Sequence, residues 1–176
     1  MKSLIISAIG SDRPGIVSEI SGVITSHGGN VEESRMTRLG SDFAIIMLVS
    51  VAPDWVESLI VALQAINELT IITKPTKTQE AEKGKQFQID LTGADNEGIV
   101  KVLSKYLAGE FINILEMKTH ISNAPVTGTP LFNLTALTSI PENINISNIQ
   151  SDLNRIAQKL GVGIIAHQSE YTAETD

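Results

Sequence analysis

Apolar and polar positions follow two periods along this chain, one typical of strands and one of helices. The run Leu4 to Ile9 is short and apolar, and from Ile16 onward apolar residues recur every three to four positions, as on one face of a helix. Val31 to Arg38 is highly charged, whereas Phe43 to Val51 is almost continuously apolar, which indicates an edge strand beside a central one. The first half therefore predicts strands at 4–9, 31–38, 43–51 and 69–73 and helices at 16–27 and 53–66, in the order βαββαβ.

The turn between the first strand and the first helix occurs twice. Gly10-Ser-Asp-Arg-Pro-Gly-Ile-Val17 recurs as Gly93-Ala-Asp-Asn-Glu-Gly-Ile-Val100, and the offset of 83 residues from Asp12 to Asp95 persists well beyond the motif. A repeat of this length indicates two copies of one supersecondary unit. The second half accordingly predicts strands at 87–92, 114–121, 131–140 and 162–168 and helices at 99–107 and 147–160.

The repeated order predicts the fold class. Right-handed crossovers turn each βαββαβ unit into a four-stranded antiparallel sheet with both helices on one face, a ferredoxin-like α+β domain. The polar stretch 74–85 indicates a linker, so we expect domains at 1–75 and 86–170, a linker at 76–85 and a polar tail at 171–176. We also expect Asp12 to cap the first helix, and Ser147 with Gln150 to form a capping box on the last.

Composition narrows the class of protein. The 176 residues include no cysteine, which excludes disulfides and thiolate zinc sites, and 42% are hydrophobic, as in a globular chain. No apolar run approaches the length of a membrane span and no signal peptide is recognisable, so we expect a soluble cytoplasmic protein. The net charge of −7 is spread over both halves, and neither offers the basic surface that nucleic acid binding needs. A role in transcription would therefore act through another protein.

No arrangement of residues indicates catalysis or a metal site. The three histidines, His27, His120 and His167, fall in different elements without the spacing of metal ligands. The neighbours Glu32 and Glu33 point to opposite faces of a strand and cannot act as a pair. Both turns have a G-x-x-x-x-G outline but lack the Lys-Ser/Thr that a phosphate loop requires. We therefore expect a protein that is not an enzyme and uses no cofactor.

The first turn is the candidate ligand site. A helix N-terminus presents unpaired amides and a partial positive charge, so the amides of Gly15, Ile16 and Val17 are candidate donors to a carboxylate. The Asp12 carboxylate or the Asn30 amide would hold an ammonium group a few ångströms away, and together they would suit a free α-amino acid. The alternative is that Asp12 only caps the helix and Asn30 only forms a turn.

The second turn is the weaker candidate. Asn96 and Glu97 stand there in place of Arg13 and Pro14. Glu97 puts a negative charge where the anion would dock, at the positive end of the helix dipole.

Two motifs resemble those of the ACT domain family: Asp12-Arg13-Pro14-Gly15-Ile16-Val17 and Gly28-Gly29-Asn30-Val31, set in the βαββαβ order. Two copies fill the chain without a catalytic domain, which makes the resemblance more specific. It implies tandem domains that sense a small amino acid such as glycine and assemble as a homo-oligomer. It also implies repression of transcription through contact with a LysR-type activator rather than with DNA. By position, the ligand-side residues are Asp12, Arg13, Gly15, Ile16, Val17, Asn30 and Val31, and in the second copy Asp95, Asn96, Gly98, Ile99, Asn113 and Ile114.

Two other functions stay open at this point. Duplicated sheets with degenerate pockets would serve as a constitutive interaction module, which binds its partner whether or not a ligand is present. An enzyme is the second alternative, and turnover that disappears on substitution of one of the three histidines would reveal it.

Overall fold

The computed structural model describes residues 1–77, 85–125, 127–142 and 144–169, and the chain divides into two compact units, Met1–Glu80 and Ala81–Asp176. Most of the linker expected at 76–85, and all of the tail expected at 171–176, lie outside the described residues. None of the helices within those ranges is both long and apolar enough to cross a bilayer.

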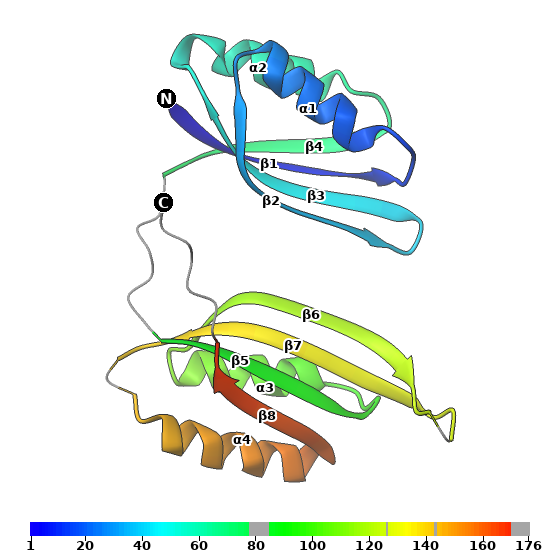
Figure 1. Cartoon of the computed structure of the whole chain (residues 1–176), viewed down its shortest axis with the longest axis vertical. Coiled ribbons are helices and arrows are strands. Elements are labelled where there is room, and N and C mark those ends of the chain that lie inside the picture. The colour runs from blue at the N-terminus through cyan, green and yellow to red at the C-terminus, as the bar shows by residue number, and fades with distance from the viewer. Residues whose placement is uncertain (78–84, 126, 143, 170–176) are drawn as a thin grey trace. The chain divides into compact units, whose positions relative to one another are not determined.

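The first unit is a four-stranded antiparallel sheet with two helices on one face (Figure 1). Its strand order is β2-β3-β1-β4, so β3 and β1 are central and the charged strand β2 is an edge. Both the predicted order of elements and this edge position are confirmed. The elements are β1 (Lys2–Ser11), α1 (Ile16–Ser26), β2 (Asn30–Leu39), β3 (Asp42–Val51), the 3₁₀ turn η1 (Pro53–Trp55), α2 (Val56–Gln64) and β4 (Leu69–Thr76).

The core of this unit forms between the sheet and the helices. Alternate residues of β1 are buried on the helix side: Leu4, Ile6 and Ala8. The helix α1 meets them with isoleucines spaced along one face: Ile16, Ile20 and Ile24. Burial of one such side chain contributes about 1.5–3 kcal/mol. The other face of the sheet carries neither helix, and most of its side chains are half-buried or exposed.

The second unit repeats the first. Its sheet has the order β6-β7-β5-β8, which matches β2-β3-β1-β4 strand for strand. Both edge strands that follow the first helix of a unit contain a bulge, after Val31 in β2 and after Ile114 in β6. The predicted fold class, two ferredoxin-like α+β domains, is therefore confirmed. The elements are β5 (Lys85–Ala94), α3 (Ile99–Gly109), β6 (Asn113–Asn123), β7 (Pro130–Ile140), α4 (Ile146–Leu160) and β8 (Val162–Gln168).

Two predicted helix caps and the predicted end of one strand are wrong. Asp12 does not cap α1, because Gly15 occupies the N-cap position and no side chain bonds to the helix start. The helix α4 begins earlier than its predicted capping box, at Asn145, whose side chain accepts a hydrogen bond of 2.9 Å from the Ser147 amide. The strand β4 continues to residue 76 because Pro75 lies in an edge strand, where a missing N–H is tolerated.

The two units differ in the turn that follows their first helix. Gly28 and Phe111 occupy equivalent positions, and both have a positive φ, of 65° and 56°. This conformation costs an L-residue roughly 1–2 kcal/mol. The Phe111 side chain is 85% exposed, so burial does not offset the strain.

Phe111→Gly is expected to raise the free energy of unfolding of the second unit by about 1 kcal/mol, since the strain disappears and little apolar burial is lost. Urea unfolding followed by circular dichroism measures the change. Phe111→Ala keeps the strained backbone and should leave stability nearly unchanged. A less stable glycine variant would contradict this account of the turn.

Tyr106 on α3 is half-buried, and its hydroxyl donates a hydrogen bond of 3.4 Å to Asp152 on α4. Burial, followed by the negative charge of Asp152, raises the pKa of Tyr106 to about 12. The unfolded state, with a pKa near 10, loses this proton first as pH rises. The stability that the neutral phenol contributes is therefore present below about pH 10 and is lost toward about pH 12.

Tyr106→Phe is expected to make the fall in stability between about pH 10 and about pH 12 less steep, because phenylalanine has no proton to lose. Urea midpoints of both proteins at several pH values across this window measure the two slopes. Equal slopes would show that Tyr106 is not coupled to folding.

Candidate functional site

The predicted ligand turn joins the end of β1 to the start of α1. Gly15 precedes the first helical residue with φ of 94°, a conformation that glycine adopts freely. A Cβ built on Gly15 would meet no atom within 4 Å, so backbone conformation rather than crowding requires glycine, and the space above it is open. The amides of Ile16 and Val17 belong to the first helical turn, where the helix supplies no acceptor.

An open cavity of about 560 Å³ lies over this helix end. Its volume falls within the roughly 300–1,000 Å³ typical of small-molecule sites. Ser18 and Phe43 complete its lining. The structure thus brings together five of the predicted residues, namely Asp12, Arg13, Gly15, Ile16 and Val17.

Both charged side chains of the turn already have partners. Arg13 donates a hydrogen bond of 2.6 Å to Glu19 and lies 3.5 Å from a Glu68 carboxylate oxygen. The hydrogen bond to Glu19 raises the pKa of Arg13 above its ordinary value, so its charge is permanent. The Asp12 carboxylate lies 3.4 Å from Arg38 Nε, in an ion pair that is largely exposed and therefore weak.

Asn30 and Val31 lie at the other end of the sheet. Through its pairing with β3, Asn30 is level with Ser3 of β1, whereas the turn follows Ser11. The eight steps from Ser3 to Ser11 span roughly 26 Å at about 3.3 Å per residue. The expectation that the Asn30 amide lies close to Asp12 is therefore wrong within one domain, because α1 runs back along the sheet before β2 begins.

The second turn has the same backbone with different side chains. Gly98 precedes Ile99, the first residue of α3, with φ of 85°. Asn96 donates a hydrogen bond of 3.2 Å to the Leu160 carbonyl at the end of α4, so this side chain is engaged by another helix. Asp95 is exposed. The remaining candidates of this copy open β6, again at the far end of the sheet: Asn113 and Ile114.

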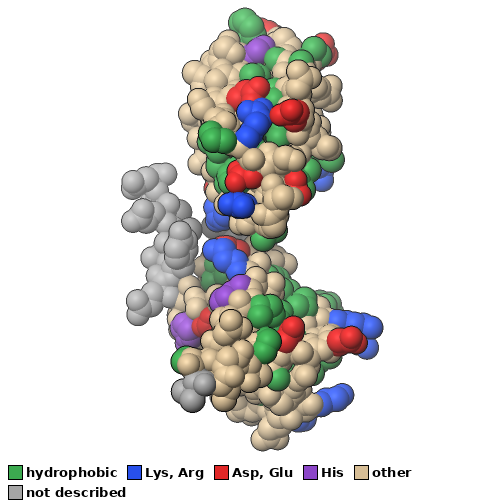
Figure 2. Space-filling model, turned by 90° about the vertical axis from the view of Figure 1, so that its right-hand side faces the viewer, with side chains coloured by type: hydrophobic (Ala, Val, Ile, Leu, Met, Phe, Trp, Pro, Cys, Tyr) green, Lys and Arg blue, Asp and Glu red, His purple; other side chains and the backbone are tan. Residues whose placement is uncertain are grey.

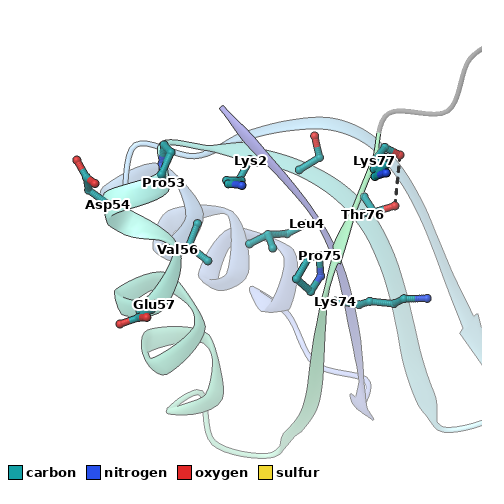
Figure 3. Close-up of a pocket in the computed structure, with 11 residues that line it drawn as sticks. Lys2, Leu4, Pro53, Asp54, Val56, Glu57, Lys74, Pro75, Thr76 and Lys77 are labelled. Atoms are coloured by element: carbon teal, nitrogen blue, oxygen red, sulfur yellow. Dashed lines mark hydrogen bonds between the residues drawn. The ribbon is translucent and has the colours of Figure 1, made fainter.

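A larger pocket, of about 940 Å³, lies at the end of the first unit away from the turn (Figure 3). It forms where β1 begins and β4 ends beside η1 and α2, and Leu4 and Val56 lie between its two charged sides. Sequence reasoning missed it because its lining comes from three distant segments that share no motif. The charged residues are Lys2 and Lys74 from the strands, Lys77 just after β4, and Asp54 and Glu57 from the helical side.

The histidines make local contacts. The Nδ1 atom of His27 lies 2.8 Å from the Val23 carbonyl of its own helix, and its ring meets Trp55 edge-on at 6.0 Å. His167 lies 4.0 Å from Asp90. In the described part of the chain, no three acidic or histidine side chains are grouped so that they could hold a metal ion.

Charge is mixed on the face of the molecule that Figure 2 shows. On the described part of the face shown in Figure 2, acidic and basic side chains are interspersed and form no continuous basic region. Such a face lacks the electrostatic pattern that binds a phosphate backbone.

Comparison with known proteins identifies a family for the first unit and relatives for the whole chain. The model of the ACT domain matches residues 2–74. The glycine cleavage system transcriptional repressor of Escherichia coli (strain K12) is 27% identical over 165 residues, which cover 89% of this chain and 85% of the relative. A solved structure of an unknown protein from Galdieria sulphuraria has a TM-score of 0.82 at 31% identity and covers 96% of this chain and 98% of its own. Another, of a protein assigned as a glycine cleavage system transcriptional repressor, has a TM-score of 0.71 at 21% identity, over 97% and 98%.

The family match lies on the first unit, and the second unit repeats its strand order. Both solved structures cover nearly the whole chain, and therefore both units. The first unit is an ACT domain, the second unit repeats its fold, and the whole chain is similar to the glycine cleavage system transcriptional repressor of Escherichia coli.

Proposed function

We propose that this chain is a non-enzymatic regulatory protein that senses a small amino acid at its first turn. The observation that carries the proposal is the cavity of about 560 Å³ over the start of α1, which Gly15, Ile16 and Val17 line. A carboxylate in this cavity would accept hydrogen bonds from amides that have no partner within the helix. The positive end of the helix dipole would favour it further.

Asp12 is the side chain that would hold the ammonium group of the ligand. It lines the same cavity, and its present partner, Arg38, lies 3.4 Å away in an exposed ion pair. An exposed pair of this kind contributes little, so exchange of the guanidinium for a ligand ammonium carries a small penalty. Arg13 stays bonded to Glu19 and adds positive potential beside the carboxylate.

The proposed site is restricted to the turn of the first domain. Asn30 and Val31 lie at the far end of the same sheet and do not join it within one domain. The second turn is the weaker site, because Asn96 is engaged by the Leu160 carbonyl and Glu97 opposes an anion.

We further propose that the ligand acts on transcription through a protein partner in the cytoplasm. The Escherichia coli relative is named a transcriptional repressor, and the net charge of −7 disfavours direct contact with DNA. The family resemblance supports glycine as the ligand and a LysR-type activator as the partner. A ligand changes partner binding only if it prefers one conformational state, and a coupling of about 1–3 kcal/mol is typical.

Isothermal titration with glycine, serine and other free amino acids tests the site. Asp12→Ala is expected to weaken binding about tenfold or more, because a charge-assisted hydrogen bond to the ligand is lost. Its melting temperature should hardly change, since Asp12 caps no helix and its ion pair is exposed. Asp54→Ala is the matched control, because it removes an exposed carboxylate that lines the larger pocket of the same unit.

Two results would contradict this proposal. No heat with any amino acid, together with an unchanged melting temperature, would favour a constitutive interaction module. A loss of affinity in Asp54→Ala but not in Asp12→Ala would move the ligand to the larger pocket.

A further inference from the structure

The open face of the first sheet is apolar at its centre. The strands β1, β3 and β4 direct side chains to this face from positions that alternate with the core residues. Three of them, Ile9, Ile46 and Ile72, are 53%, 46% and 65% exposed. Ser7 of β1 lies between Ile46 and Ile72 in the same row, so the apolar side chains surround one small polar residue. Exposed apolar side chains gathered on one face mark an interaction site when the patch is large. The full apolar set is Ile5, Ile9, Ala44, Ile46, Leu48 and Ile72.

The same face of the second sheet carries polar side chains that form hydrogen bonds with one another. Asp90 accepts hydrogen bonds of 2.8 Å from Gln88 and from Thr135, and Thr92 donates one of 3.1 Å to Asn133. Four of these polar side chains stand where the first unit has isoleucine or alanine, and Asp90 stands where it has Ser7. By register, Gln88 replaces Ile5, Thr92 replaces Ile9, Asn133 replaces Ala44 and Thr135 replaces Ile46.

One row of residues across the open face of the first sheet has an acidic residue at one end and a basic residue at the other. Strand pairing aligns Glu33 of β2 with Leu48, Leu48 with Ile5, and Ile5 with Lys74 of β4. An acid therefore lies at one edge of the sheet and a base at the other, with apolar residues between them. Arg35 forms an exposed ion pair of 3.0 Å with Glu33 on the same strand.

We propose that this face is a self-association surface, on which a second copy of the chain packs its own first sheet. A two-fold axis parallel to the strands places β2 opposite β4 of the second copy, and β3 opposite β1. Glu33 then faces Lys74 of the second copy, and the symmetry repeats this pair at the other edge. Packed sheets lie about 10 Å apart, a distance that the two long side chains span together.

The pairing of Glu33 with Lys74 requires this axis. An axis across the strands would instead place β2 opposite β2 of the second copy, where the opposite charge nearest to Glu33 would be Arg35 and Lys74 would take no part. The surface lies away from the cavity at the first turn, so this proposal does not rest on amino-acid sensing. Failure of either proposal leaves the other standing.

Sedimentation equilibrium of the full chain measures the self-association. The wild type is expected to dimerise, and Ile72→Thr to weaken the dimer about tenfold, because each copy loses apolar burial at the interface. Ile165→Thr is the matched control, since it changes the equivalent isoleucine of the second sheet, which is 66% exposed, and should leave the dimer unchanged. A wild type that stays monomeric, or equal effects of the two substitutions, would overturn the proposal.

Charge exchange tests the arrangement itself. Lys74→Glu and Glu33→Lys are each expected to abolish their own dimer, because two like-charged pairs then face each other. When the two variants are mixed, every pair is again of opposite sign, and a heterodimer should form. Variants that each dimerise as the wild type does, or a mixture that stays monomeric, would overturn the proposed axis.

Discussion

A four-stranded sheet with both helices on one side buries one face and leaves the other face without a helix. This constraint governs both halves of the chain. Alternation with a period of two sends Leu4, Ile6 and Ala8 to the helices and the residues between them to the other side. Binding sites must then lie on parts of each unit that are not buried in the core. In each unit these are the ends of the sheet, where strands give way to helices, and the uncovered face.

The first turn illustrates how one end of the sheet becomes a site. Gly15 takes a positive φ that redirects the chain from strand to helix, and the first amides of α1 then border an open cavity. The Asp12 carboxylate does not bond to the helix start but forms an exposed ion pair with Arg38. A ligand ammonium group could therefore replace the guanidinium at little cost. The second copy keeps the backbone through Gly98 but ties Asn96 to α4. Duplication thus preserved the turn, while the side chains around it diverged.

Much of this architecture could be predicted from the sequence because it depends on local pattern. The repeat, the order of strands and the edge position of β2 follow from periodicity and from charge along the chain. The partner of Asp12 could not be predicted in this way, because Arg38 reaches the turn from a hairpin that is distant in sequence. The position of Asn30 at the far end of the sheet could have been predicted from the sequence, since an 11-residue helix carries the chain back along the sheet.

The larger pocket lay beyond sequence reasoning altogether. Its charged rim combines Lys2, Asp54 and Lys74, which only the folded topology brings together. The same holds for the opposed charges Glu33 and Lys74 on the open face, which become a row only through strand register. Motifs within one segment are visible in a sequence, whereas sites assembled from distant strands need the pairing of those strands.

We propose above that a small zwitterion docks on the amides at the start of α1. The most direct measurement is a titration of the isotopically labelled chain with glycine, followed through its backbone amide resonances. The largest saturable shifts are expected at Gly15, Ile16 and Val17. Saturable shifts that centre instead on the pocket lined by Lys2 and Lys74, or no shifts at the turn, would contradict the proposal.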